Sequence, residues 1–92
     1  MIASFRNKAL QRFFEQGETK RLSVPNASKI ARILRALEAA SEPHDMNLPG
    51  LRFHALSGDR QGRYAVNASA NWRVTFGWSG EDAVDVDLED YH

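Results

Sequence analysis

The stretch that decides the fold is residues 72–78, which read Trp-Arg-Val-Thr-Phe-Gly-Trp. Large apolar side chains fall on every second residue of it, and Arg73, Thr75 and Gly77 alternate with them. A period of two is typical of a β-strand with one buried face. The stretch therefore predicts a strand that packs one face on a core and leaves the other, with Arg73, open to solvent or substrate.

Further short strands are predicted on both sides of this one. Upstream, residues 52–56 and 63–68 are strand-like, and residues 58–62 between them have glycine at both ends, which indicates a hairpin turn. Downstream, residues 79–82 indicate a second hairpin turn. In the last strand, alternation predicts one face with Val84, Val86 and Leu88 and an opposite face with Asp85, Asp87 and Glu89.

Two helices are predicted before these strands, after a short first strand at residues 2–5. Apolar residues recur at helical spacing between Asn7, a suitable N-cap, and Gly17, which ends the run. A longer helix is expected to begin near Pro25 and to close at Pro43. Its apolar stripe consists of Ile30, Ile33, Leu34 and Leu37.

Helices followed by hairpin-linked strands predict an α+β fold, in which two N-terminal helices pack on one face of a twisted, mainly antiparallel sheet. A chain of 92 residues has the length of one domain, expected to span residues 1–92. The apolar face of residues 72–78 is expected to pack on Leu10, Phe13, Phe14, Ile30, Ile33 and Leu37.

Composition excludes several classes of site. The absence of cysteine rules out disulfides, thiolate catalysis and Cys-based zinc sites, and it fits a reducing compartment. With no apolar run of membrane-spanning length and no visible signal peptide, we expect a cytoplasmic protein that does not bind a membrane. Residues 1–80 hold 12 basic and 6 acidic side chains, whereas residues 81–92 hold 6 acidic ones and no base. This segregation is compatible with a phosphate-binding face and equally with charges scattered over a solvated surface.

Two residues in the strand region have side chains suited to phosphate chemistry. Arg73 would keep its charge at any working pH and could hold a phosphate, or it could pair with Asp85 or Asp87 across the hairpin. His54 precedes the first hairpin turn and could transfer protons near neutral pH. A histidine in such a strand can also be an ordinary surface residue, as we expect of His44.

The chain ends in three titratable residues, Asp90, Tyr91 and His92. Asp90 could orient an imidazole, and Tyr91 could donate a proton or stack on a base. In a regular strand Tyr91 would point away from its two neighbours, so a shared site needs a twist or a bulge. A metal site formed by His54, Asp90 and His92 is a weaker alternative, because no local histidine spacing supports it.

Four pieces of sequence, spread in order over nearly the whole chain, resemble the HigB branch of the RelE superfamily, the toxins of type II toxin–antitoxin pairs. They are Met1-Ile2 through Ser4-Phe5, His54-x-Leu56-x-Gly58-Asp59-Arg60-x-Gly62, Asn71-Trp72-Arg73-Val74-Thr75-Phe76, and Asp90-Tyr91-His92.

The resemblance implies a RelE-like microbial ribonuclease fold and an mRNA endoribonuclease that cuts messages in the ribosomal A site and so inhibits translation, with no metal or other cofactor. It implies proton transfer by His54 and His92, with Asp90 and Tyr91 positioning and stabilising. Arg73 would hold the scissile phosphate, and Arg60 and Arg63 are predicted as further RNA- or phosphate-binding residues.

The same resemblance implies the partners: a helix-turn-helix antitoxin of the HigA type, the 70S ribosome with its mRNA, and operator DNA only through the antitoxin complex. Several relatives have a lysine where this chain has Ser57. The loss of that charge leaves open a module that binds RNA or the ribosome without cutting, or an attenuated toxin that acts mainly as a corepressor with its antitoxin.

Overall fold

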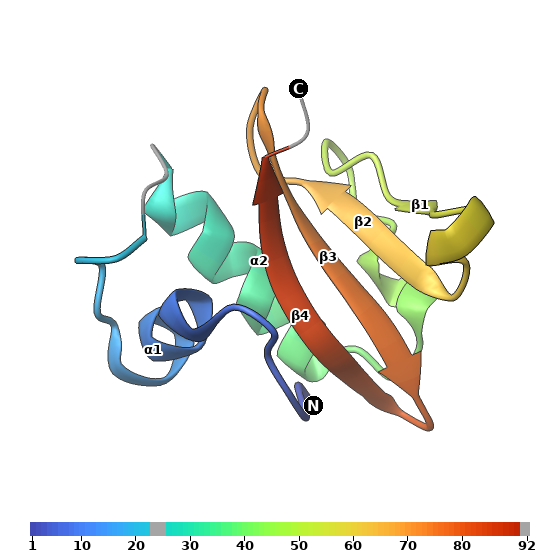
Figure 1. The fold of residues 1–92 in the computed structure, drawn as a ribbon, viewed down its shortest axis with the longest axis horizontal. Coiled ribbons are helices and arrows are strands. Elements are labelled where there is room, and N and C mark those ends of the chain that lie inside the picture. Colours follow the sequence, from blue (N-terminus) through green and yellow to red (C-terminus); the bar gives the residue numbers. More distant parts are fainter. Residues whose placement is uncertain (23–25, 91–92) are drawn as a thin grey trace.

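The computed structural model describes residues 1–22 and 26–90. Within these residues the chain forms two α-helices, two 3-10 turns and a four-stranded sheet (Figure 1). The strands lie in chain order and every neighbouring pair is antiparallel, which confirms the predicted α+β class. They are β1 (His54–Ala55), β2 (Arg63–Asn67), β3 (Trp72–Ser79) and β4 (Asp82–Asp90).

The first helix, α1 (Lys8–Gln16), has the predicted limits, because the Asn7 side chain accepts a hydrogen bond from the Leu10 amide and Gly17 adopts φ 72°. The second helix, α2 (Ala27–Ala39), begins after the N-cap Asn26, and Pro25 lies outside the described residues. It ends before Pro43, which begins the 3-10 turn η1 (Pro43–Met46). No helix among residues 1–22 and 26–90 is long and apolar enough to cross a membrane.

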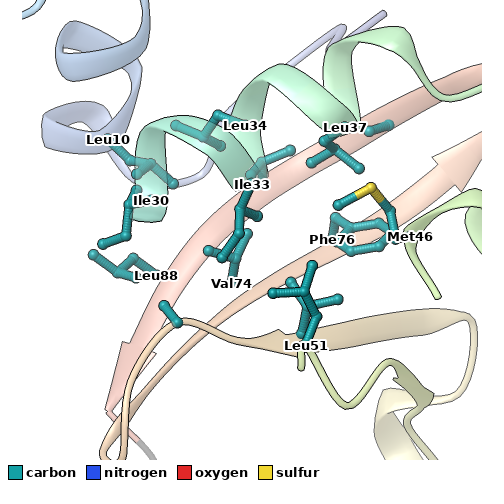
Figure 2. Packing of buried hydrophobic residues seen from close by; sticks show 14 of the residues in the cluster. Leu10, Ile30, Ile33, Leu34, Leu37, Met46, Leu51, Val74, Phe76 and Leu88 are labelled. Atoms are coloured by element: carbon teal, nitrogen blue, oxygen red, sulfur yellow. The ribbon is translucent and has the colours of Figure 1, made fainter. Parts of the chain in front are cut away.

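The core lies between the two helices and one face of the sheet (Figure 2). Val74 and Phe76 of β3 are fully buried there, while Trp72 and Trp78 at its ends are partly buried and pack against the cluster. The apolar face predicted for residues 72–78 is thereby confirmed, whereas the opposite face is not left open as predicted, because Thr75 and Gly77 are buried and Arg73 is partly buried. Burying each large aliphatic or aromatic side chain stabilises the fold by roughly 1.5–3 kcal/mol. The buried helix residues are Leu10, Ile30, Ile33, Leu34 and Leu37.

The predicted alternation of β4 is wrong at Val84. Residues 85 and 86 both lie between the Gly77–Val84 and Thr75–Asp87 pairs, so two residues of β4 oppose one of β3. This is a β-bulge, in which Asp85 has φ 51°. Val84 consequently lies opposite Gly77, on the face away from the helices.

The bulge changes which residues of β4 are buried. Before it, Ala83 belongs to the core cluster, and after it Val86 and Leu88 do. Because a one-residue shift reverses the faces of a strand, Asp87 and Glu89 are directed to the side away from the helices.

Residues 2–5, predicted as a first strand, form two isolated parallel bridges to β4 instead. Ile2 pairs with Ala83 and Phe5 with Val86, and the amide of Ile2 also donates to Glu38 of α2 at 2.9 Å. The N-terminal segment therefore runs along the edge of β4 and contacts the helix layer (Figure 1).

Candidate active site

The face of the sheet opposite the helices brings His54 and Arg73 onto one surface. Residues that lie opposite each other in an antiparallel pair point to the same face. One such row across the sheet consists of His54, Ala65, Thr75 and Asp87. The adjacent row on the same face consists of Asn67, Arg73 and Glu89. We call this surface the open face.

The register also sets the separation of His54 and Arg73. They are two strands apart across the sheet and two residues apart along it. Strand spacings of about 4.8 Å and rises of about 3.3 Å per residue place their Cα atoms roughly 12 Å apart. Two long side chains can reach a common group at this distance, although they do not touch each other directly.

The imidazole of His54 is oriented by the backbone of Arg52. Its Nδ1 lies 2.9 Å from the Arg52 carbonyl oxygen, and His54 is exposed. Because a carbonyl oxygen only accepts, Nδ1 must bear the hydrogen, and the neutral ring then has its lone pair on Nε2. Arg52 itself adopts φ 52°, a left-handed conformation that is uncommon for a residue other than glycine.

Glu89 is the centre of a charged cluster on the open face. Arg60, from the 3-10 turn η2 (Gly58–Arg60), donates from Nη1 and Nη2 to the two carboxylate oxygens, and the Thr75 hydroxyl donates to one of them. Arg73 Nη2 lies 3.8 Å from Oε1 of the same carboxylate. The Arg60 hydrogen bond, with help from Thr75 and against the effect of burial, lowers the pKa of Glu89 to about 2.

Arg63 was predicted to bind phosphate, and in the structure its guanidinium group donates hydrogen bonds to other parts of the protein. It donates to Thr75 Oγ1 at 3.1 Å and to the carbonyl oxygen of Asp85 at 2.9 Å, which is the bulge residue. Burial, together with the nearby Arg6 and Arg60, lowers the pKa of Arg63. Arg63 thus links the bulge to the cluster and adds a third cation to Arg60 and Arg73.

The C-terminal residues of the predicted site are only partly described. Asp90 ends β4 and lies opposite Trp72, so by alternation it leaves the strand on the helix side, whereas Glu89 is on the open face. Tyr91 and His92 lie outside the described residues. In the part of the chain that the structure describes, no group of three or more His, Cys, Asp or Glu side chains could hold a metal ion.

Arg73 forms an ion pair with Glu89. The sequence had indicated Asp85 or Asp87 as its alternative partner. The bulge is the reason. In a regular hairpin that pairs Ser79 with Asp82, the residue opposite Arg73 would be Leu88. The one-residue shift replaces it with Glu89. Neither Glu89 nor Thr75 was singled out by the sequence. Their contacts depend on the bulge, so finding them from the sequence would have required predicting the bulge first.

Fold and open face together define a small α+β protein with a cluster of arginines and an exposed histidine on the side of the sheet opposite the helices, which is an arrangement suited to a phosphate-containing ligand. Comparison with known proteins agrees. The family model for the RelE-like toxin of the type II toxin–antitoxin system HigB matches residues 3–92. A relative named Endoribonuclease HigB, from Proteus vulgaris, is 37% identical over 92 residues, which is all of both chains. The chain belongs to the HigB-like toxin family.

Proposed function

We propose that this protein is an endoribonuclease toxin that cleaves messenger RNA in the ribosomal A site and thereby inhibits translation in the cytoplasm. The observation that supports this most is the common face of His54 and the arginines Arg60, Arg63 and Arg73. The relative from Proteus vulgaris is named as an endoribonuclease, which supports the same reaction here.

The proposed reaction begins when a base removes the proton of a ribose 2′-hydroxyl. The oxygen then attacks the adjacent phosphorus in line, while Arg73 offsets the negative charge that develops on the phosphoryl oxygens. An acid protonates the departing 5′-oxygen, so that the chain breaks and a 2′,3′-cyclic phosphate is formed. Each well-placed acid or base contributes roughly 10²–10⁴ in rate, which makes two such groups and one arginine sufficient.

We assign the base to His54. Its Nδ1 hydrogen is engaged with the Arg52 carbonyl, so that the neutral ring offers Nε2 as the proton acceptor. His92 would be the acid, and Asp90 and Tyr91 would position and stabilise it, as the resemblance to the family implies. His54 is exposed, which suits an RNA strand that the ribosome already holds in position.

The proposed partners follow from the family. A type II toxin has an antitoxin, and we propose a helix-turn-helix protein of the HigA type. This antitoxin would bind operator DNA, and this chain would reach the operator only as part of the antitoxin complex. The ribosome with its mRNA would be the target.

The decisive experiment is cleavage of a translated message by the purified chain, mapped by primer extension. His54→Ala is expected to lower the rate by about 10²–10⁴, because the proton acceptor is lost. His44→Ala is the matched control, since His44 is an exposed histidine in η1 whose ring contacts Phe53. Cleavage by His54→Ala at the wild-type rate would refute the assignment.

The same assay tests His92→Ala and deletion of His92. Both are expected to abolish cleavage and growth arrest while the far-ultraviolet circular dichroism stays unchanged. A truncated protein that still cuts translated messages would remove the C-terminus from the site.

A second candidate function is binding without cleavage. Ser57 is exposed and precedes η2 as its N-cap residue, so this position lacks the cation that several relatives have near the phosphate. Growth arrest with intact transcripts would favour this module. An operator gel shift that responds to this chain only together with the antitoxin, in the absence of cleavage, would favour the corepressor.

A further inference from the structure

The Arg60–Glu89 contact joins parts of the chain that are 29 residues apart. Arg60 belongs to η2, in the connection between β1 and β2, and Glu89 is near the end of β4. Across the open face, Glu89 is opposite Arg73 on β3. The carboxylate of Glu89 therefore contacts both Arg60, in the turn that follows the strand with His54, and Arg73 on β3.

We propose that Glu89 is a positioning residue that holds the guanidinium groups of Arg60 and Arg73 together where the scissile phosphate binds. The proposal rests on the ribonuclease function proposed above. An arginine side chain has a long flexible stem, and a two-point contact with a carboxylate fixes the plane of its guanidinium group. Cations that are already oriented need no rearrangement when charge develops on a phosphate.

Thr75 fixes the carboxylate itself. The residue is fully buried, and its hydroxyl donates to Oε2 of Glu89 while it accepts from Arg63. The Glu89 side chain is 21% exposed and that of Arg73 is 18% exposed. Glu89 is thus held by Arg60 from η2 and by Thr75 and Arg73 from β3, and Arg63 of β2 supports it indirectly through Thr75.

The charges of the cluster are compatible with this role. Arg60 and Arg73 would repel each other if they approached a phosphate without a carboxylate between them. Glu89 offsets part of that repulsion, and with Arg63 the cluster of three cations and one anion still has a net charge of +2. The carboxylate thus lets the three cations stay close together.

The opposite role would make Glu89 a competitor that occupies the phosphate position and has to leave before RNA binds. The two roles predict opposite signs. If Glu89 positions the arginines, its neutralisation slows cleavage, whereas if it competes with phosphate, its neutralisation accelerates cleavage.

The test is the rate of mRNA cleavage on translating ribosomes for Glu89→Gln and Glu89→Asp. We expect Glu89→Gln to lower kcat about 10- to 100-fold, since misplaced charge donors cost about this much. KM should stay equal or fall, because the open face loses a negative charge. Glu89→Asp, which keeps the charge, should recover part of kcat.

Glu81→Gln provides the matched control. It removes one negative charge from an exposed residue in the turn between β3 and β4, and it should cleave like the wild type. Cleavage by Glu89→Gln at or above the wild-type rate would overturn the proposal.

A second measurement does not depend on activity. In ¹⁵N spectra of the arginine side chains, the Nε–H signals of Arg60 and Arg73 should be dispersed in the wild type and move toward the values of mobile arginines in Glu89→Gln. Signals unchanged by the substitution would also overturn the proposal. A wild-type protein that fails to cut any message rejects the proposed function, and the spectra still decide the role of Glu89.

Discussion

Among single residues, Glu89 is notable because Arg60 holds its pKa well below the ordinary value. Its position also bears on the segregated charges of the sequence. Glu89, one of the six acidic residues after position 80, lies within the arginine cluster and offsets part of its charge. The basic face and the acidic strand are thus joined at this residue.

A pH dependence of stability follows. The pKa of Glu89 is about 2 in the folded protein, below its ordinary value of 4.5, so its contribution is complete above pH 4.5 and is lost as the pH falls toward 2. With screening at the partly exposed Arg60, this contribution is on the order of 2 kcal/mol. Urea unfolding of wild type and Glu89→Gln at pH 6 and pH 2.5 measures it. Because pH 2.5 is still above the folded pKa, the wild type should lose most of this contribution, about 1.5 kcal/mol, relative to the variant, and equal losses would contradict the prediction.

The types of the site residues could be predicted from sequence, but their contacts could not. Arg73 and His54 were recognised by their chemistry, and the strand register then places them on one face. The partner of Arg73 was missed because it depends on the register after residue 85. Residue type identifies a chemically able side chain, whereas register decides what stands opposite it.

At the scale of elements, the strands and turns were predictable because their signals are local. Gly17, Gly62 and Gly80 all have positive φ and lie where the sequence indicated an end or a turn. The bulge has a weaker signal, because Asp85 is one polar residue in a strand that already alternates acidic and apolar residues. Aspartate tolerates a left-handed conformation better than most residues, which is consistent with its position there.

Substitution of Asp85 tests the bulge. A β-branched residue is strongly disfavoured at φ 51°, so Asp85→Val should lower the free energy of unfolding by about 1–3 kcal/mol. Asp85→Gly, which fits positive φ, should cost much less. Because the Arg63 bond uses the backbone carbonyl of residue 85, both variants retain its acceptor. Equal stability of the two variants, measured by urea unfolding, would show that the positive φ of residue 85 does not determine the cost of the substitution.

At the scale of the whole molecule, residues from both ends of the chain meet. The backbones of residues 1–6 exchange hydrogen bonds with Ala83 and Val86, and Phe5 and Ile2 pack against the core. The segment thus covers the edge of β4 at Ala83 and Val86 and hinders pairing with another molecule there.

Deletion of residues 1–5 should therefore lower the stability of the protein and also cause it to self-associate. We expect a loss of about 3 kcal/mol or more from the lost hydrogen bonds and apolar burial. Size-exclusion chromatography should show oligomers formed through the uncovered edge of β4. Asp82→Asn is the control, because it removes only the exposed 3.6 Å ion pair with the N-terminal amine and should cost less than about 1 kcal/mol. A monomeric deletion variant with an unchanged melting temperature would contradict this.

The pairing of Ile2 and Phe5 with Ala83 and Val86 has a consequence for biosynthesis. A polypeptide is made from its amino end, so residues 2–5 must wait until residues 83–86 have been synthesised before their backbone finds these partners. The nascent chain thus stays incomplete during its own elongation. The proposed target of this protein is an elongating ribosome, so this delay would protect the ribosome that is synthesising the protein.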